Sequence, residues 1–361
     1  MTGHDSVAFP RRWWYPACLS GQLGTKPLGI TLMDTPLVLF RDASGCPAAV
    51  LDRCAHRNAP LSLGSVHGDG CLQCPYHGWR YDGTGRCRVV PGLLGEASSR
   101  TRDVLSHATC EQDGFVWVWG ESSTEPTARP FALPMLEGRA GRVVFPCDLD
   151  CTLHAALENT LDVPHTAFLH RGIFRGTRTK EVKAVRRSLP DGCEVEFVGE
   201  PVGLGRLQGG PLAGKVFEHW DRFFLPSVAQ VEYRVDGWLT VCNTVLHLPL
   251  SPFRTRAWFV LQWTSPLPAS VIRPIVQVRG RQVLKQDATM LAHQSAQIRR
   301  FGGESFTSTE LDLLGAAIWR LLRQAERAEG QGGGADAPAP ADLSDLEGGA
   351  EAEAQEITFR A

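Results

Sequence analysis

The sequence predicts an α+β protein of two domains, in which an all-β N-terminal domain precedes a domain with an antiparallel sheet covered by helices. Three observations lead to this prediction. The chain of 361 residues is long enough for two ordinary domains. Its first third consists of short apolar runs separated by Gly and Pro, which is typical of short strands joined by turns. Its later part places long strand-like runs before helical ones, as α+β domains do.

The first domain is expected over residues 1–125. Its clearest strand-like runs are PLVLFRD (36–42), AAVLD (48–52) and GFVWVWG (114–120). Residues 126–139, which begin PTARPFALP, are rich in Pro and are expected to form a linker.

The second domain is expected over residues 140–328. Its predicted elements, in chain order, are a helical segment at 151–170, a hairpin around PDG at 190–192, strands at 230–236, 238–250 and 256–265, and helices at 279–300 and 308–328. The remaining residues, 329–361, contain many Gly, Ala, Pro and acidic residues and too few apolar ones to build a core. We therefore expect an acidic disordered tail there.

Composition narrows the function classes and the compartment. A 43% apolar and 21% charged content is typical of a soluble globular protein, and a net charge of −2 gives no reason to expect a nucleic-acid surface. Neither the first residues nor the apolar stretch at 257–278, which prolines interrupt, has the pattern of a signal peptide or a membrane span. The 11 cysteines are an odd number. Metal ligation in a reducing cytoplasm therefore fits better than a disulfide framework.

Four potential metal ligands lie close together in the first domain: Cys54, His56, Cys74 and His77. A structural zinc site is one interpretation, but the single residue between Cys54 and His56 is a tight spacing for two ligands of one tetrahedral ion. A CxxC pair formed by Cys71 and Cys74 is another, but it lacks a partner pair. A Rieske-type [2Fe–2S] cluster has two Cys on one iron and two His on the other. It is favoured because each closely spaced Cys/His pair then supplies one ligand to each iron.

A second set of potential ligands occupies ALENTLDVPHTAFLH at 156–170. Asp162 and His165 are three residues apart and would share one face of a helix. His170 lies off that face unless Pro164 breaks the helix. A capped helix with ordinary polar residues is the plain interpretation. The functional one is a 2-His-1-carboxylate iron site with open positions for dioxygen.

The carboxylate of such a site would come from elsewhere in the chain. In the helix predicted at 279–300, Asp287 falls in the apolar stripe formed by Val283, Leu284, Met290, Leu291 and Ile298. A buried carboxylate is costly unless it has a partner. An arginine could be that partner and is the simpler explanation for the helix alone. Together with the two histidines, the position favours metal ligation.

Both sets of residues resemble one family. C-x-H followed by C-P-Y-H-G-W resembles the Rieske domain of the Rieske non-heme iron oxygenases, and E-N-x-x-D-x-x-H-x-x-x-x-H resembles their mononuclear iron motif. The resemblance implies that Cys54, His56, Cys74 and His77 hold a [2Fe–2S] cluster and that His165, His170 and Asp287 bind Fe(II). It also implies that Asp162 is the carboxylate that links a cluster histidine to an iron-ligating histidine of a neighbouring subunit.

The resemblance further implies partners and an activity. The partners are dioxygen and a separate NAD(P)H-dependent flavin or ferredoxin reductase, and the assembly is a homotrimer. The activity is monooxygenation of an apolar small molecule. The segment CPYHGWRYDGTGRC is similar to the branch that acts on large polycycles, so we expect hydroxylation or oxidative demethylation of a sterol-like substrate. The residues expected to include some of the pocket lining are Phe217, Trp220, Phe223, Phe224, Trp238, Trp258, Phe259 and Trp263.

Other functions remain open on the sequence alone. The runner-up within the family is an aromatic-acid O-demethylase or ring hydroxylase. From other classes, a Rieske electron carrier would bind about two irons per chain instead of about three. A zinc-stabilised interaction protein would bind zinc and would be colourless.

Overall fold

The computed structural model describes residues 5–136, 140–171, 181–199, 218–235, 237–330 and 355–360. They fall into two compact units. Phe9–Ala132 make up most of the first, called the N-terminal unit here, and Leu133–Arg327 make up most of the second, the sheet unit. The change from one unit to the other lies within the segment 126–139. In the described residues, no helix is both long and apolar enough to cross a membrane.

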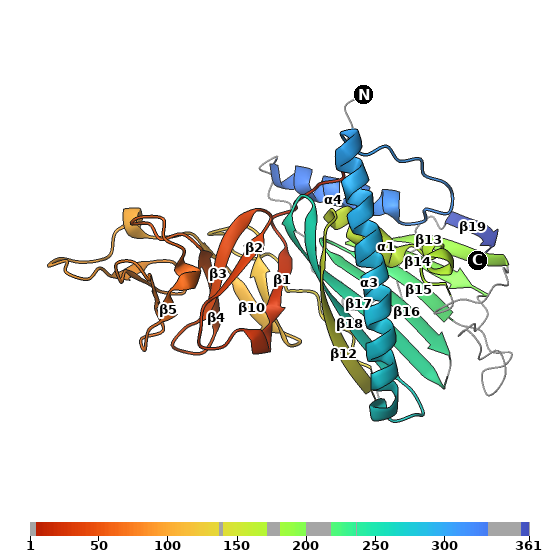
Figure 1. Cartoon of the computed structure of the whole chain (residues 1–361), viewed down its shortest axis with the longest axis horizontal. Coiled ribbons are helices and arrows are strands. Elements are labelled where there is room, and N and C mark those ends of the chain that lie inside the picture. Colours follow the sequence, from red (N-terminus) through yellow and green to blue (C-terminus); the bar gives the residue numbers. More distant parts are fainter. Residues whose placement is uncertain are drawn as a thin grey trace. The chain divides into compact units, whose positions relative to one another are not determined.

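The N-terminal unit is all β, as predicted. It contains three small antiparallel sheets (Figure 1). The first has β1 (Trp14–Leu19), β11 (Phe115–Trp119) and β10 (Thr109–Gln112); the second has β2 (Leu28–Leu32), β3 (Thr35–Arg41), β4 (Pro47–Leu51) and β9 (Ser106–His107); the third has β5 (Ser65–Val66), β6 (Leu72–Gln73), β7 (Arg80–Tyr81) and β8 (Cys87–Val89).

The core of this unit joins the second and third sheets. Val38 and Phe40 of β3 pack in one buried cluster with Leu72 of β6 and Tyr81 of β7. Cys54 and Cys74 belong to the same cluster. The loops that carry the four potential ligands are therefore anchored to the apolar core.

The sheet unit is built on one eight-stranded antiparallel sheet, in the order β12-β18-β17-β16-β15-β14-β13-β19. Its strands are β12 (Ala140–Leu149), β13 (Glu181–Leu189), β14 (Gly192–Val198), β15 (Glu218–Phe224), β16 (Val228–Val235), β17 (Leu239–Ser251), β18 (Arg254–Thr264) and β19 (Gln355–Arg360). Its helices are α1 (Leu153–Leu161), α2 (His165–Phe168), α3 (Ala269–Phe301) and α4 (Gly315–Gly330). The prediction of an antiparallel sheet with helices is confirmed.

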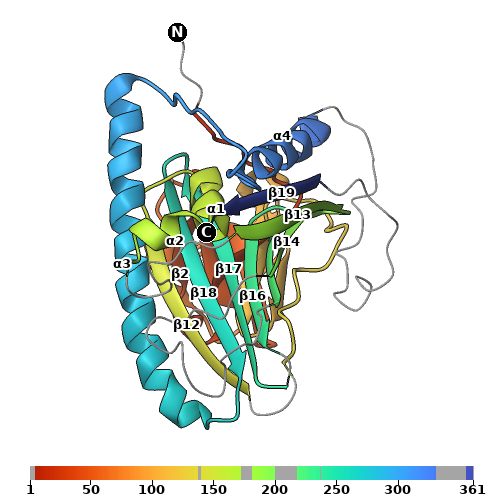
Figure 2. The same cartoon turned by 90° about the vertical axis from the view of Figure 1, so that its right-hand side faces the viewer.

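The helices cover one face of the sheet, which we call the inner face (Figure 2). Odd-numbered residues of the central strands, among them Phe223, Ala229 and Val245, point to this face and form one core with Leu157 of α1 and Ile318 of α4. On the β12 side, Leu284 of α3 packs on inner-face residues of β12 and β18. The inner face is thus the side of the sheet that α1, α2 and α3 cover.

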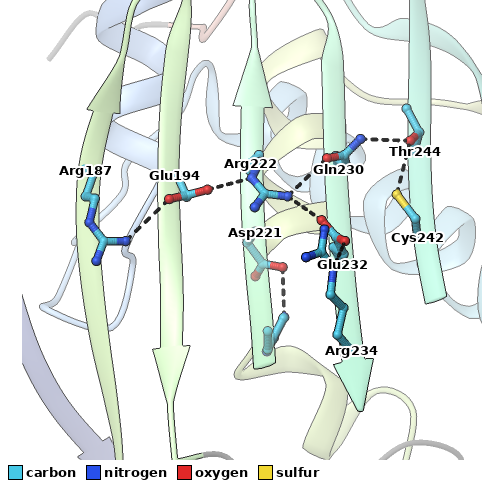
Figure 3. Close-up of polar contacts among 10 residues, drawn as sticks. Arg187, Glu194, Asp221, Arg222, Gln230, Glu232, Arg234, Cys242 and Thr244 are labelled. Carbon is cyan, nitrogen blue, oxygen red and sulfur yellow. Dashed lines mark hydrogen bonds and ion pairs between the residues drawn. The ribbon is translucent and has the colours of Figure 1, made fainter. Parts of the chain in front are cut away.

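The opposite, outer face carries a buried ionic network (Figure 3). Arg222 of β15 donates from Nε to Glu194 Oε2 of β14 at 2.6 Å and from Nη1 to Glu232 Oε2 of β16 at 2.7 Å. Gln230 also accepts from Arg222 and donates to Thr244 of β17. Arg222, Glu194 and Glu232 are all buried.

Several boundaries differ from the prediction, and helix α4 begins at Gly315 instead of 308. Helix α3 begins at Ala269 instead of 279, because Pro274 is accommodated inside the helix and does not end it. The tail prediction is wrong for residues 355–360, which form β19 and pair with β13. Ile357 in that segment packs against the core, so this short run provides apolar contact. Residues 331–354 lie outside the described residues.

Candidate metal centres

Two loops of the N-terminal unit share one turn geometry around their cysteines. In the first, Cys54 N donates to Ala59 O and Asn58 N donates to Cys54 O, both at 2.9 Å. In the second, Cys74 N donates to Trp79 O at 2.8 Å and Gly78 N to Cys74 O at 3.2 Å. The fifth residue of each turn has a positive φ, +60° at Asn58 and +71° at Gly78, a conformation that favours Asn and Gly. The two loops therefore present their cysteines in the same way.

The histidines of these loops lie side by side. The ring centroids of His56 and His77 are 4.6 Å apart, and Trp79 stacks on His56 with an interplanar angle of 2°. Nδ1 of His56 is buried and has no hydrogen-bond partner among the described residues. Burial, together with the neighbouring His77 and Arg57, lowers the pKa of His56. A neutral imidazole with an unpartnered buried nitrogen is the form that ligates a metal.

The two cysteines of these loops, Cys54 and Cys74, are both buried. Burial raises the pKa of the Cys74 thiol, and the neighbouring Cys54 thiol raises it further. A buried thiol with a raised pKa, such as that of Cys74, loses its proton readily only to a metal, which replaces the proton. Cys71 is also buried, and burial raises its pKa to about 11.

Tyr81 of β7 was not identified from the sequence as part of this site. Its hydroxyl lies 3.2 Å from Cys54 Sγ and accepts a hydrogen bond from the N–H of Ala55 at 3.3 Å. Tyr81 is fully buried, and burial raises its pKa, with a further contribution from the hydrogen bond to Cys54. The phenol therefore stays protonated and can donate to the sulfur. The only signal in the sequence was a tyrosine just after the second ligand loop.

Three side chains of the sheet unit converge on one point: His165, His170 and Asp287. Among the described residues, they are the one group of three or more His, Cys, Asp or Glu whose ligand atoms all lie within 4.8 Å of one another. The distances are 3.2 Å from His165 Nε2 to His170 Nε2, 3.0 Å from His170 Nε2 to Asp287 Oδ1, and 3.7 Å from His165 Nε2 to Asp287 Oδ1.

These distances fit a single ion. At a metal–ligand distance of about 2.1 Å, ligand atoms at right angles are about 3 Å apart. Two histidines and one carboxylate on one side of an ion form the facial triad of non-heme Fe(II) oxygenases, which leaves further positions open. Among the described residues, the four ligand candidates of the N-terminal unit do not form such a group.

The break between α1 and α2 explains how both histidines reach the triad. The predicted helical segment 151–170 is in fact two helices, because α1 ends at Leu161 and α2 begins at His165. Pro164 disfavours helical conformation at the preceding residue, so the chain leaves α1 there. His165 and His170 therefore need not share a face of one helix.

Asp287 is held by the middle of α3. It is buried with Leu284 and Leu291, whereas Met290, which was assigned to the same stripe, is exposed. The ion pairs that Asp287 makes among the described residues are with His165 and His170, so the alternative of an arginine partner is wrong there. Its Oδ1 has no hydrogen-bond partner among the described residues.

Each histidine of the triad has an oxygen behind its other nitrogen. Asp162 Oδ2 lies 3.4 Å from His165 Nδ1, and Gln286 Oε1 lies 2.9 Å from His170 Nδ1. Burial alone would lower the pKa of His170, but the neighbouring carboxylate of Asp287 and the amide oxygen of Gln286 raise it. In the sequence, Gln286 was noted only as part of the Q-D context that the family resemblance gives to Asp287, with no role for its side chain.

The inner sheet face near the triad is largely apolar. Val231 and Phe259 are half-buried and pack in the same core as Ala288, the residue after Asp287. Asn243 lies between Val231 and Leu261 in the strand register. The inner-face positions of β16, β17 and β18 carry no Arg or Lys.

The aromatic residues expected near the pocket fall on both faces. The inner face carries Phe223, Phe259 and Trp263, and the outer face carries Trp220, Phe224 and Trp258. The β16–β17 turn carries Trp238. Phe217 lies outside the described residues.

Family models match both units. One, described as a Rieske [2Fe-2S] domain, matches residues 13–97, and another, described as the vanillate O-demethylase oxygenase C-terminal domain, matches residues 149–328. The crystal structure of dicamba monooxygenase bound to 3,6-dichlorosalicylic acid has the same fold, with a TM-score of 0.74 at 24% identity, and the match covers 90% of this chain and 99% of that one.

Two curated relatives are similar in sequence. The oxygenase component of dicamba O-demethylase from Stenotrophomonas maltophilia is 40% identical over 169 residues, which are 46% of this chain and 49% of that protein. The alignment thus spans about half the length of this relative. The 4β-methylsterol monooxygenase of Methylococcus capsulatus is 31% identical over 263 residues, 71% of this chain and 69% of that protein. With both family models matched and this relative aligned over more than two thirds of its length, the chain belongs to the Rieske non-heme iron oxygenases, which carry a [2Fe–2S] cluster and a mononuclear iron.

Proposed function

We propose that this chain is the oxygenase component of a Rieske-type monooxygenase that hydroxylates or oxidatively demethylates a bulky apolar polycyclic substrate, with a sterol-like ring system favoured. The convergence of His165, His170 and Asp287 beside an apolar sheet face is the observation that carries the proposal. Family membership and the alignment with the methylsterol monooxygenase support it.

The residues divide the chemistry between two sites. Cys54 and Cys74 would hold one iron of the cluster, and His56 and His77 the other. A bound cluster supplies electrons one at a time, and Fe(II) held by His165, His170 and Asp287 supplies open positions for dioxygen. Asp162, placed 3.4 Å from His165, would accept a hydrogen bond from its Nδ1 and connect that ligand to the cluster histidine of another subunit.

This arrangement implies partners. A separate NAD(P)H-dependent flavin or ferredoxin reductase would reduce the cluster, since the sequence has no strand-following G-x-G-x-x-G fingerprint of its own. The relative named as an oxygenase component supports a multi-component system. A closed ring of three copies would bring a cluster of one subunit to the iron of the next.

The substrate distinguishes the main proposal from the runner-up, an aromatic-acid O-demethylase. A carboxylate substrate is best bound by Arg or Lys. The described inner-face positions of the three central strands carry neither, which favours an uncharged apolar substrate. The dicamba O-demethylase relative is the observation that keeps the runner-up in consideration.

A turnover screen tests the proposal. The protein, a surrogate reductase, NADH and dioxygen are incubated with a sterol and triterpenoid mixture and, in parallel, with aromatic acids such as vanillate and dicamba. Mass spectrometry then detects added oxygen or lost methyl carbon. Oxidation in the lipid set alone is expected. Oxidation of the aromatic acids alone would replace the main proposal with the runner-up. Metal analysis excludes an electron carrier if it finds about three irons per chain.

A further inference from the structure

Successive residues of α3 place an oxygen beside each nitrogen of the His170 ring. Asp287 Oδ1 lies 3.0 Å from Nε2, and Gln286 Oε1 lies 2.9 Å from Nδ1. His170 itself is 1% exposed, so its ring is enclosed. Neighbouring helical positions are about 100° apart, and this spacing lets one helix reach both edges of the same imidazole.

The hydrogen bond to Gln286 determines which nitrogen of His170 can ligate a metal. A neutral imidazole has one N–H donor and one lone pair. The oxygen of a glutamine amide can only accept, so Nδ1 must carry the proton and Nε2 must carry the lone pair. Nε2 is the nitrogen that faces His165 and Asp287. The contact therefore directs the lone pair to the point where the three ligand atoms meet.

From this geometry we infer that Gln286 is a positioning residue for the iron site, which fixes the tautomer and the ring plane of His170. The inference rests on the proposed assignment of the triad as the iron site and adds a residue to it. Hydrogen-bond partners of this kind typically change metal affinity by 10–100-fold when they are removed.

The side chains behind the two histidines of the triad differ in charge. His165 has the carboxylate of Asp162 behind it, and His170 has the uncharged amide of Gln286. A carboxylate at position 286 would also accept from Nδ1, but it would place a second negative charge beside Asp287. The amide provides the hydrogen bond without that repulsion in the metal-free protein.

Three variants test the role of Gln286. Gln286→Leu keeps a similar side-chain volume but removes the acceptor, and Gln286→Glu keeps an acceptor. Gln282→Leu is the matched control, because Gln282 lies one turn earlier on α3, is exposed and accepts from Arg279 instead. Each full-length protein is prepared with its cluster intact and its mononuclear site emptied by a chelator, and Co²⁺ is then titrated by equilibrium dialysis.

The expected result is one Co²⁺ per chain in the parent protein, 10–100-fold weaker binding in Gln286→Leu, and parent-like or tighter binding in Gln286→Glu and Gln282→Leu. The EPR spectrum of Co²⁺, recorded with the cluster oxidised and silent, should match the parent in Gln286→Glu. Unchanged affinity in Gln286→Leu would overturn the inference, and so would equal loss in both Gln286 variants. Failure of the parent itself to bind Co²⁺ would instead overturn the proposed metal site. If Gln286→Leu does not fold, the affinity and spectrum of Gln286→Glu decide.

Discussion

The hydroxyl of Tyr81 lies 3.2 Å from the sulfur of Cys54, and both groups are buried in the core of the N-terminal unit. A hydrogen bond to a ligating sulfur stabilises the extra negative charge of a reduced cluster and so raises its reduction potential. Removing the donor should have the opposite effect.

Tyr81→Phe is therefore expected to lower the reduction potential of the cluster by tens of millivolts, while the cluster stays bound. Protein-film voltammetry measures the shift. Tyr15→Phe is the control, because Tyr15 is equally buried but donates to Pro10 O instead. A potential that is the same in both variants would show that Tyr81 does not act on the cluster.

Asp162→Asn should retain both metals but slow electron transfer to the mononuclear site by several orders of magnitude. The amide keeps the size of the side chain and removes the charge that faces His165 Nδ1. Metal analysis and single-turnover kinetics from the pre-reduced cluster measure the two effects separately. Normal turnover in Asp162→Asn would rule out the bridging role.

Asn243→Leu should raise KM for the substrate at least tenfold with a smaller effect on kcat. Asn243 is the one amide among the inner-face positions of β16, β17 and β18, and its neighbours Val231 and Leu261 are apolar. We expect it to bind the single polar group of an otherwise apolar substrate, and a lost hydrogen bond costs about 1–3 kcal/mol. Thr240→Val, on the outer face of the same strand, should leave KM unchanged. Equal KM values for the Asn243 variant and the parent would remove Asn243 from the binding site.

Arg222→Leu is expected to destabilise the sheet unit by about 3–5 kcal/mol, because it leaves the buried carboxylates of Glu194 and Glu232 without their shared partner. Arg256→Leu breaks the pair with Asp148, which is more than a third exposed, and should cost at most about 1 kcal/mol. Urea unfolding of the two variants measures the difference. Similar losses would mean that the network contributes no more than a surface ion pair.

Asp191→Asn should stabilise the protein at neutral pH and have little effect near pH 4. Burial raises the pKa of Asp191 from 3.8 to about 6, and its Oδ2 has no hydrogen-bond partner among the described residues. The folded state therefore binds more protons than the unfolded state between these pH values, and the parent loses stability as pH rises through this window. Thermal unfolding at pH 4, 5, 6 and 7 should show a growing advantage for the variant. An advantage that is constant with pH would exclude ionisation of Asp191 as the cause.

The candidate metal-site residues could be selected from the sequence because their patterns are local. Cys54 with His56, Cys74 with His77, and His165 with His170 are short motifs, and Asp287 was visible as a carboxylate within an apolar stripe. The roles of Tyr81 and Gln286 could not be predicted. Each acts through a contact with a residue that is distant in the sequence, Cys54 for Tyr81 and His170 for Gln286.

Parts of the sheet could not be predicted from the sequence, again for physical reasons. Strand β15, EHWDRFF, lacks apolar alternation because Arg222 is buried in an ionic network, so no strand was predicted there. Strand β12 contains Pro146, which an edge strand tolerates and a central strand does not. The face on which Trp220 or Trp258 lies depends on register, and pairing partners fix register only in the folded sheet.

Placing Asp287 in the middle of a 33-residue helix has a consequence for how this protein can change over evolution. One inserted or deleted residue between Leu284 and Asp287 would turn the carboxylate by about 100° and shift it by about 1.5 Å relative to the packed Leu284. Length variation in that stretch is therefore incompatible with metal binding, whereas the segment after Phe301 is free of this constraint. Among homologues, gaps should be absent between these two positions and tolerated beyond the end of α3.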